Sequence, residues 1–359
     1  MKLKRVLALA LGVTLSMSFM GCGNAGNEAS GASNGSEAAS QTGGEKGDEA
    51  EEVTHFIAAH ASTNESTLGQ FFLSIQKYLE ENTDDLRMDL YPAGQLGSDV
   101  ELAESIVENS IQMTSGAAAN FVNVVPDMSV FDLPFAFDSY WQMRNASSDE
   151  ALVNAFDKVL EKKNLKLGVL RAEGFRTLFT KKPVEHYEDI KGLQIRVMDN
   201  KYHISLWKQL GANPTTVAFT ELYTALQQGV VEAQENTTTA TLTNYNLYEV
   251  TNYATISKHE TTIHPFLINL EWFNSLSEKK QKELIDACNY AKENEADLEK
   301  GDEESLEMLK KDYGYEVYEF TDEDIEKCRE ATKETWNEIQ TGVDQELYNA
   351  LIGALKKNK

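Results

Sequence analysis

Strand-like and helix-like segments alternate along most of this chain, and this alternation restricts the fold more than any other feature. Residues 53–60 have the pattern of a strand, and apolar residues then recur at helical spacing over 68–79. A second strand-like run, 86–91, ends at Pro92, and Ser98 or Asp99 can cap the helix that follows. Strands separated by amphipathic helices predict an α/β protein with largely parallel sheets.

The alternation continues to about residue 276 and then gives way to helices. Further strands are expected at 165–170, 193–198 and 230–234, and further helices at 202–210 and 221–228. Gly211 and Gly229 follow these two helices, where glycine commonly ends a helix. Ser277 can cap a long helix, and residues 322–357 form another helical tract. Trp141 and Trp207 are expected in the core.

The charge of the chain excludes one class of partner. The 359 residues carry a net charge of -25, and no basic stripe is visible, so we expect no nucleic-acid partner. An anionic ligand would be repelled by the overall charge. A few local cations must therefore attract any such ligand.

The first 52 residues have the composition of a targeting signal followed by a linker. A basic start precedes an apolar run over 6–20, which is too short to span a membrane, so 1–22 are expected to be a signal peptide. Residues 19–22 (FMGC) resemble the lipobox of bacterial lipoproteins, although Phe19 replaces the usual leucine; the resemblance implies lipidation of Cys22. An ordinary signal peptide with an incidental cysteine is the alternative. Residues 23–52 contain almost no large apolar side chain and are expected to form a flexible tether.

Catalytic and metal-binding motifs are missing from the sequence that follows. The six histidines form no H-E-x-x-H pattern, and no cysteine pair has the spacing of metal ligands. Cys288 and Cys328 are compatible with a disulfide, which their spacing alone cannot establish. We therefore expect no enzyme, no metal and no cofactor, and a secreted hydrolase is the less favoured alternative.

Several sequence blocks together resemble one known family. They are 91–97 (YPAGQLG), 191–197 (KGLQIRV), 210–214 (LGANP), 218–227 (AFTELYTALQ) and 234–236 (QEN). Their order and spacing are similar to those of DctP-type solute receptors of tripartite ATP-independent periplasmic (TRAP) transporters, over about residues 53–355. The chain departs from the family pattern at Met198, where proline is common, and at Ala233 and Thr237, where glycine and proline are usual.

The resemblance implies a two-lobed α/β fold like that of periplasmic binding proteins, with mixed or parallel sheets, a long lobe-spanning helix and a helical C-terminal region. Lobe I is expected to comprise 53–173 and about 262–300, and lobe II 174–261 and about 301–359. The implied partners are a small organic anion and the membrane permease subunits. The protein is expected to be a monomer, held outside the cytoplasm by its lipid anchor at the membrane or in the periplasm.

Arg196 is the first candidate for the ligand site. It lies between Ile195 and Val197 on an expected strand, so its side chain faces away from theirs. A guanidinium group matches a carboxylate with two parallel hydrogen bonds, and the resemblance makes Arg196 the carboxylate clamp. The alternative is a structural ion pair.

Other candidates share the expected cleft. Arg176 matches a second ligand-contacting arginine of the family, Asn236 offers both a donor and an acceptor, and Phe219 resembles an aromatic residue of the pocket. Each also has a structural interpretation, as a surface arginine, a turn residue or a core aromatic. The weaker candidates are His60, Ser115, Asp199 and Glu173.

The expected function is the capture of a C4-dicarboxylate, a keto acid or a hydroxylated sugar acid for a TRAP permease. We favour a hydroxylated acid because Glu173, His60 and Asp199 can exchange hydrogen bonds with hydroxyl groups. The alternative is a carboxylate-sensing module with the same fold and pocket, and the sequence does not distinguish it from a transport receptor.

Overall fold

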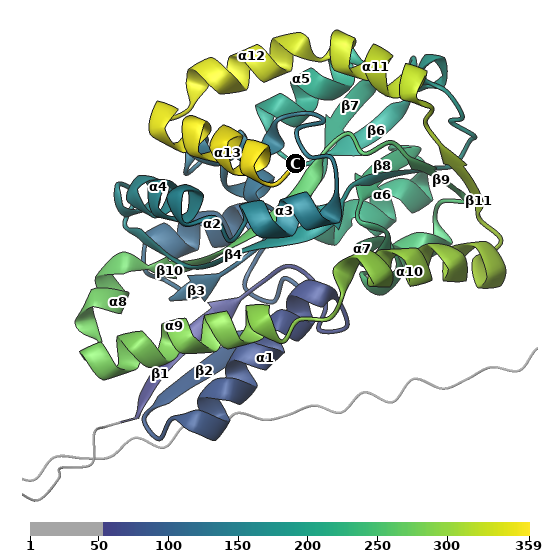
Figure 1. Cartoon of the computed structure of the whole chain (residues 1–359). Coiled ribbons are helices and arrows are strands. Elements are labelled where there is room, and N and C mark those ends of the chain that lie inside the picture. The colour runs from purple at the N-terminus through teal and green to yellow at the C-terminus, as the bar shows by residue number, and fades with distance from the viewer. Residues whose placement is uncertain (1–52) are drawn as a thin grey trace, which may run out of the picture. The chain divides into compact units, whose positions relative to one another are not determined.

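The computed structural model describes residues 53–359 (Figure 1). The expected signal peptide, the tether and Cys22 lie outside the described residues. The described part contains two mixed sheets with helices around them. No helix within residues 53–359 is both long and apolar enough to span a membrane.

The first sheet has the strand order β2-β1-β3-β10-β4. Its first three strands are parallel to one another, and β10 is antiparallel to both β3 and β4. The expected strand at 86–91 is present with the same limits. The strands are β1 (Thr54–Ala59), β2 (Leu86–Tyr91), β3 (Met113–Thr114), β4 (Leu165–Phe175) and β10 (Thr261–Asn269).

The second sheet has the order β11-β9-β5-β8-β6-β7. Strand β6 is parallel to β7 and β8, whereas β5 is antiparallel to β8 and β9. Strand β8 begins three residues later than the expected strand 230–234. The strands are β5 (Thr177–Thr180), β6 (Gln194–Val197), β7 (Asn213–Thr216), β8 (Ala233–Asn236), β9 (Tyr253–Ile256) and β11 (Glu316–Glu319).

Two short stretches carry the chain between the sheets. Strand β4 ends at Phe175 and β5 begins at Thr177, so Arg176 alone separates a strand of the first sheet from a strand of the second. The return path is the segment between β9 and β10, and its Glu260 carbonyl accepts a hydrogen bond from the Arg176 backbone N–H at 3.0 Å. The antiparallel direction of β4 and β10 follows from this double crossing, which local sequence patterns do not predict.

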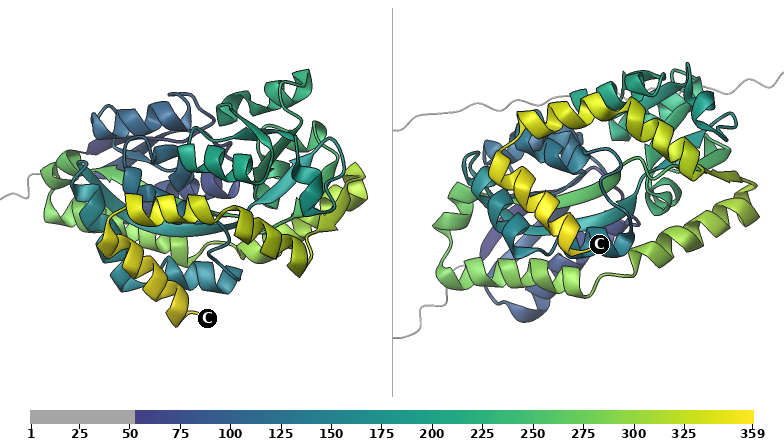
Figure 2. Two further views of the ribbon diagram at one scale, coloured as in Figure 1. Left: turned by 90° about the horizontal axis from the view of Figure 1, so that it is seen from above. Right: turned by 45° about the horizontal axis from the view of Figure 1, so that its top comes forward.

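Helices α9 (Glu278–Glu293) and α10 (Leu298–Tyr313) run one after the other along one side of the molecule (Figures 1 and 2). Ser277 caps α9, as expected, by accepting a hydrogen bond from the Lys280 N–H. Helix α9 packs against α1 (Thr67–Asn82) and β4, while α10 packs against α7 (Thr238–Thr243) beside the second sheet. The expectation of one long lobe-spanning helix is therefore wrong in detail, because the helix ends at Glu293 and a second one, capped by Asp297, begins at Leu298.

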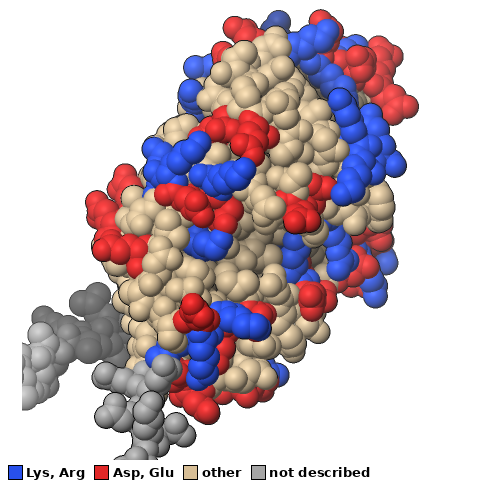
Figure 3. Space-filling model, turned by 60° about the vertical axis from the view of Figure 1, so that its left-hand side comes forward, with Lys and Arg blue, Asp and Glu red and all other residues tan. Residues whose placement is uncertain are grey.

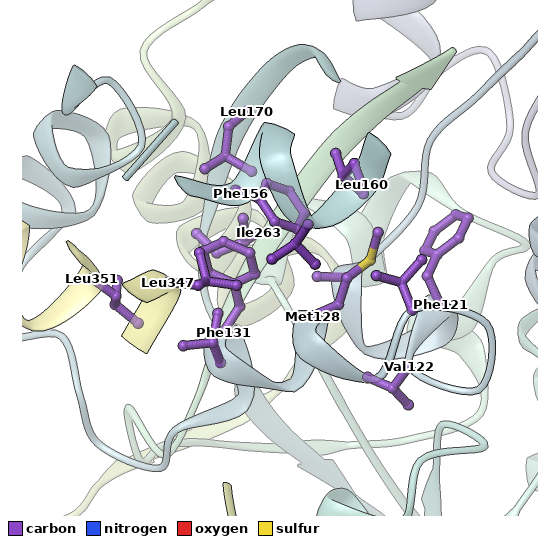
Figure 4. Packing of buried hydrophobic residues seen from close by; sticks show 14 of the residues in the cluster. Phe121, Val122, Met128, Phe131, Phe156, Leu160, Leu170, Ile263, Leu347 and Leu351 are labelled. Carbon is purple, nitrogen blue, oxygen red and sulfur yellow. The ribbon is translucent and has the colours of Figure 1, made fainter. Parts of the chain in front are cut away.

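The C-terminal tract forms three helices, α11 (Asp322–Ala331), α12 (Lys333–Gly342) and α13 (Gln345–Lys357). They form an arch that starts beside the second sheet and ends over α4 (Glu150–Glu161) (Figure 2). Leu347 and Leu351 of α13 join Phe131 and Phe156 in the core beside the first sheet (Figure 4). For α13 the packing therefore differs from the expected division, which placed 301–359 in lobe II, because its apolar face is buried against α4. The remaining lobe limits stay a prediction.

The two described cysteines lie in different hydrophobic cores. Cys288 packs beside the first sheet and Cys328 beside the second, and both are free thiols. Trp207 is buried as expected, but Trp141 is 58% exposed, so its assignment to the core is wrong. Helix α3 (Tyr140–Ala146) turns the indole of Trp141 outward while its neighbours Gln142 and Met143 are buried.

Candidate functional site

A cavity lies between the two sheets and brings together five of the eight predicted site residues. These are Glu173, Arg176, Arg196, Phe219 and Asn236. Strands β4, β6 and β8 supply or adjoin four of them, and Phe219 stands at the start of a short 3-10 helix, Phe219–Glu221. Residues from both expected lobes therefore line one cavity, which is the arrangement of a two-lobed binding site.

Arg196 presents its guanidinium to this cavity. Ile195 and Val197 are buried in the core of the second lobe, while Arg196 faces the other way, as strand alternation predicts. Its Nε donates to the Val217 carbonyl at 2.8 Å, and its guanidinium carbon lies 5.9 Å from the ring centroid of Phe219. Within residues 53–359, neither terminal nitrogen has a hydrogen-bond partner. Burial lowers the pKa of Arg196 to about 10, so the group remains a cation at neutral pH.

Arg176 is held by the protein itself. Its Nε and Nη2 donate to the two carboxylate oxygens of Glu235, and Nη2 also reaches the Glu235 carbonyl at 2.6 Å. Its Nη1 donates to Thr262 Oγ1 at 2.8 Å. Burial opposes the charge on Glu235, but Arg176 and His259 outweigh it and hold the pKa of Glu235 below the ordinary value. Four of the five N–H groups of the fork have protein partners, so one remains for a ligand.

Glu173 is also engaged within the protein. Thr67 Oγ1 donates to one carboxylate oxygen, and His264 Nε2 lies 3.3 Å from the other. Arg171 Nη1 lies 2.9 Å from His264 Nδ1, and because arginine only donates, that nitrogen is unprotonated and the imidazole proton is on Nε2, the nitrogen nearer to Glu173. Burial lowers the pKa of His264 to about 4, which agrees with a neutral ring.

Asn236 ends β8 at the edge of the cavity. Its Oδ1 accepts a hydrogen bond from the Thr237 N–H at 2.9 Å, which leaves the amide Nδ2 to donate. Phe219 packs edge-on against Tyr245, with 5.5 Å between ring centroids. The Phe219 ring also lies within the range of a cation–π attraction to the Arg196 guanidinium.

Three predicted residues lie elsewhere. His60 is fully buried and stacks on Phe72 at 4.7 Å between centroids, so its ring belongs to the core of the first lobe. Ser115 is buried next to the cavity residue Gly116 but does not line the cavity. Asp199 is exposed on an adjoining depression that Arg196 also lines. The structure therefore does not bring these three into the main cavity.

Sequence reasoning missed one charged residue of the cavity and one residue behind it. Asp99 lines the cavity together with Arg196, and Glu235 is paired with Arg176. The sequence suggests for Asp99 only a role as a helix cap, and Glu235 belongs to the QEN block without an assigned role. The signal for Glu235 was available, since a glutamate next to an expected pocket residue on a buried strand needs a cationic partner.

A buried polar network lies behind the cavity, where the chain crosses between the sheets. His203 on α5 (Lys201–Gln209) stands between Asp132, at 3.5 Å, and Glu260, at 3.3 Å. Burial would lower the pKa of His203, but the two carboxylates outweigh it and raise the pKa to about 9. The ring is therefore charged and connects α5 to the crossing segment.

Glu235, His259 and Glu260 form the one group of side chains in the described region whose atoms are close enough to hold a metal ion. Both carboxylate oxygens of Glu235 already accept hydrogen bonds from Arg176, and this positive charge opposes a cation at the same oxygens. The donor set therefore fits an internal ion pair better than a metal centre.

The expected lobes contact each other at the rim of the cavity. The Thr63 N–H donates to Asn244 Oδ1 at 3.0 Å, and Thr63 Oγ1 donates to the Thr243 carbonyl at 3.1 Å. Tyr245 donates its hydroxyl hydrogen to the Ala61 carbonyl. These bonds join segments about 180 residues apart and link the two expected lobes beside the cavity.

The chain matches the family described as bacterial extracellular solute-binding protein, family 7 (DctP), over residues 58–342. It belongs to this family. A solute-binding protein of Sulfitobacter sp. (strain NAS-14.1) is 31% identical over 65% of this chain and 69% of its own length. The C4-dicarboxylate-binding periplasmic protein DctP of Rhodobacter capsulatus is 28% identical over 82% of this chain and 86% of its own.

Solved structures of the family share this fold. The sugar acid binding protein DctPAm of Advenella mimigardefordensis, in complex with galactonate, superposes with a TM-score of 0.81 at 27% identity, covering 86% of this chain and 100% of that one. A TRAP periplasmic solute-binding protein of Desulfovibrio salexigens, with bound orotic acid, gives 0.79 at 25% identity, covering 85% and 99%. The predictions of a TRAP-type solute receptor and of a two-lobed α/β fold are confirmed. Members of this family are transport proteins that bind solutes.

Proposed function

We propose that this protein captures a small organic carboxylate between its lobes and delivers it to a TRAP permease. The observation that carries the proposal is the guanidinium of Arg196, which is 2% exposed, faces the cavity and leaves both terminal nitrogens without a partner in the described region. Taking an unpaired cation out of water is costly, whereas a carboxylate ligand would satisfy both nitrogens at once.

The surface charges on one face of the molecule do not explain how an anionic ligand would be attracted, so the attraction has to come from the cavity. On the face seen in Figure 3, positive and negative side chains form small intermingled groups separated by uncharged surface. Because the whole chain carries a charge of -25, binding of an anion has to depend on cations inside the cavity. Arg196 is placed to supply that attraction.

Capture follows from the division of the site between lobes. Arg196 and Phe219 belong to the expected lobe II, whereas Glu173 and Asp99 belong to lobe I, so a ligand gains its full set of contacts only when the cavity is closed. Binding therefore shifts the open–closed equilibrium towards the closed form, which we propose the permease recognises. Relatives crystallised with galactonate and with orotic acid support an acidic ligand.

The test compares the wild type with Arg196→Lys and Arg196→Ala. A thermal-shift screen of small carboxylates first identifies a ligand, because binding stabilises the native state. Calorimetric titration should then give a loss of about 3 to 5 kcal/mol for Arg196→Ala, a few hundredfold or more in affinity. Arg196→Lys should recover little of this loss, since lysine lacks the planar fork.

Arg144→Ala is the matched control. Arg144 is exposed and does not line this cavity, so its loss should leave the affinity within about 1 kcal/mol of the wild type. Full affinity of a correctly folded Arg196→Ala variant would refute the proposed clamp.

We also propose that the protein works outside the cytoplasm as a monomer, anchored through Cys22. The basic start, the apolar run and the FMGC sequence support this location.

A further inference from the structure

Asp99 is a further charged side chain that lines the cavity, together with Arg196, Arg176 and Glu173. It is the first residue of α2 (Asp99–Val107), whose N-cap Ser98 and Glu101 form a reciprocal capping box. The capping hydrogen bonds come from Ser98 and Glu101, so the Asp99 carboxylate is not needed for the cap. Within the described residues, that carboxylate accepts no hydrogen bond from any side chain or backbone N–H, although it lines the cavity.

The position of Asp99 depends on the absence of a side chain at Gly116. A Cβ atom at residue 116 would lie 2.7 Å from Asp99 Oδ1, which is closer than two non-bonded atoms approach. The glycine lets the carboxylate lie against the backbone at the wall of the cavity, where Gly116 is also a lining residue.

Asp99 and Arg196 influence each other without forming an ion pair. Burial raises the pKa of Asp99 to about 6, and the charge of Arg196 opposes this rise. Both residues line the main cavity and the adjoining depression, yet their charged atoms are not within the 4.0 Å of a salt bridge. A gap between two opposite charges in a partly desolvated site is a place where a ligand can satisfy both.

The remaining charges of the cavity are satisfied by the protein. Arg176 is paired with Glu235, and Glu173 accepts a hydrogen bond from Thr67 while His264 Nε2 lies 3.3 Å from its other carboxylate oxygen. Of the charged side chains that line the cavity, Arg196 and Asp99 therefore keep the greatest capacity to bind a ligand. One is an unpaired donor and the other an unpaired acceptor.

We infer that Asp99 accepts a hydrogen bond from a hydroxyl or ammonium group of the same ligand whose carboxylate binds Arg196. The inference rests on the proposed function and narrows its substrate class. The ligand is then a carboxylic acid with a hydrogen-bond donor on its chain, and a second carboxylate near Asp99 is repelled. This selects against simple aliphatic dicarboxylates such as succinate.

The experiment uses acids that differ mainly in the donor group. Butyrate, D-erythronate, 2-aminobutyrate and succinate form a four-carbon set, and hexanoate and D-galactonate form a six-carbon pair. Their affinities are measured by calorimetry or competition for the wild type, Asp99→Ala, Asp99→Asn and the control Glu104→Gln. Glu104 is exposed on the same helix and does not line the cavity, so its variant reproduces the change of charge alone.

For the wild type we expect the donor-bearing acids to bind at least about tenfold more tightly than the unsubstituted or dicarboxylic acid of the same length, which corresponds to one good hydrogen bond. Asp99→Ala should remove this preference. Asp99→Asn separates the two sources of the donor, because an amide oxygen still accepts from a hydroxyl but no longer attracts an ammonium group. Glu104→Gln should change nothing.

The two possible failures are distinguishable. If Asp99→Ala keeps the wild-type preferences, or if the wild type prefers succinate, the role of Asp99 is refuted even when Arg196→Ala has lost affinity. If Arg196→Ala binds every acid as the wild type does, the proposed function fails instead. The melting temperature of Asp99→Ala should be no lower than that of the wild type, because the substitution removes a desolvated carboxylate. The melting temperature therefore distinguishes a loss of ligand binding from a loss of folding.

Discussion

Replacing Arg176 by methionine would leave a buried carboxylate without its main partner, and the structure gives the size of the effect. Glu235 is 0% exposed, and after the substitution its carboxylate would keep only His259, whose Nε2 is 3.4 Å away. Removing one partner of a buried pair typically destabilises a protein by about 3 to 5 kcal/mol. This is a large share of the roughly 5 to 15 kcal/mol by which native proteins are stable.

Urea unfolding followed by circular dichroism measures this loss. With a denaturant slope of about 3 kcal/mol/M, the unfolding midpoint of Arg176→Met should fall by about 1 to 1.7 M. The double variant Arg176→Met/Glu235→Leu should recover most of the loss, because apolar residues can replace both charges in a buried pair. The control Lys158→Met breaks an exposed pair with Glu346, at 2.7 Å, and should cost about 1 kcal/mol or less.

The interaction is read from the double-mutant cycle. A coupling free energy of several kcal/mol between positions 176 and 235 would support a pair that stabilises the crossing between the lobes. The reasoning would be refuted if the losses of unfolding free energy in the two single variants were additive and each as small as in the surface control. Arg176 would then be available to bind the ligand as a second cation.

Two further predictions concern His60 and Cys22. Burial lowers the pKa of His60 to about 4, and a contact with the Ser62 backbone opposes this shift. As the pH falls from 6.5 to 4, His60 is therefore protonated in the unfolded chain but remains neutral in the native state, which lowers the free energy of unfolding. Unfolding free energies at pH 7 and pH 4 should therefore show wild type losing about 3 kcal/mol more than His60→Gln, and parallel losses would contradict a buried neutral ring. For the anchor, Cys22→Ser should move the protein from the membrane fraction to the soluble extracytoplasmic fraction, whereas an unchanged membrane fraction would rule out lipidation at this position.

The sequence determined the features that depend on neighbouring residues. Strand alternation placed Ile195 and Val197 in the core and turned Arg196 towards the cavity, and Ser277 caps the helix that its position predicted. The order of short motif blocks was sufficient for the family and therefore for the two-lobed fold. Each of these features depends on the spacing of residues that are close in the sequence or on sequence similarity to a known family.

The tertiary structure decided which charges are free and which are already paired. Arg176 and Glu235 are 59 residues apart and meet only because β5 and β8 are neighbouring strands, so the sequence could not reveal that the second arginine is neutralised. Asp99 reaches the cavity only because Gly116 leaves room for it, and His60 turns into the core because Phe72 covers its ring. Such contacts depend on the path by which distant segments cross, and local periodicity carries no information about that path.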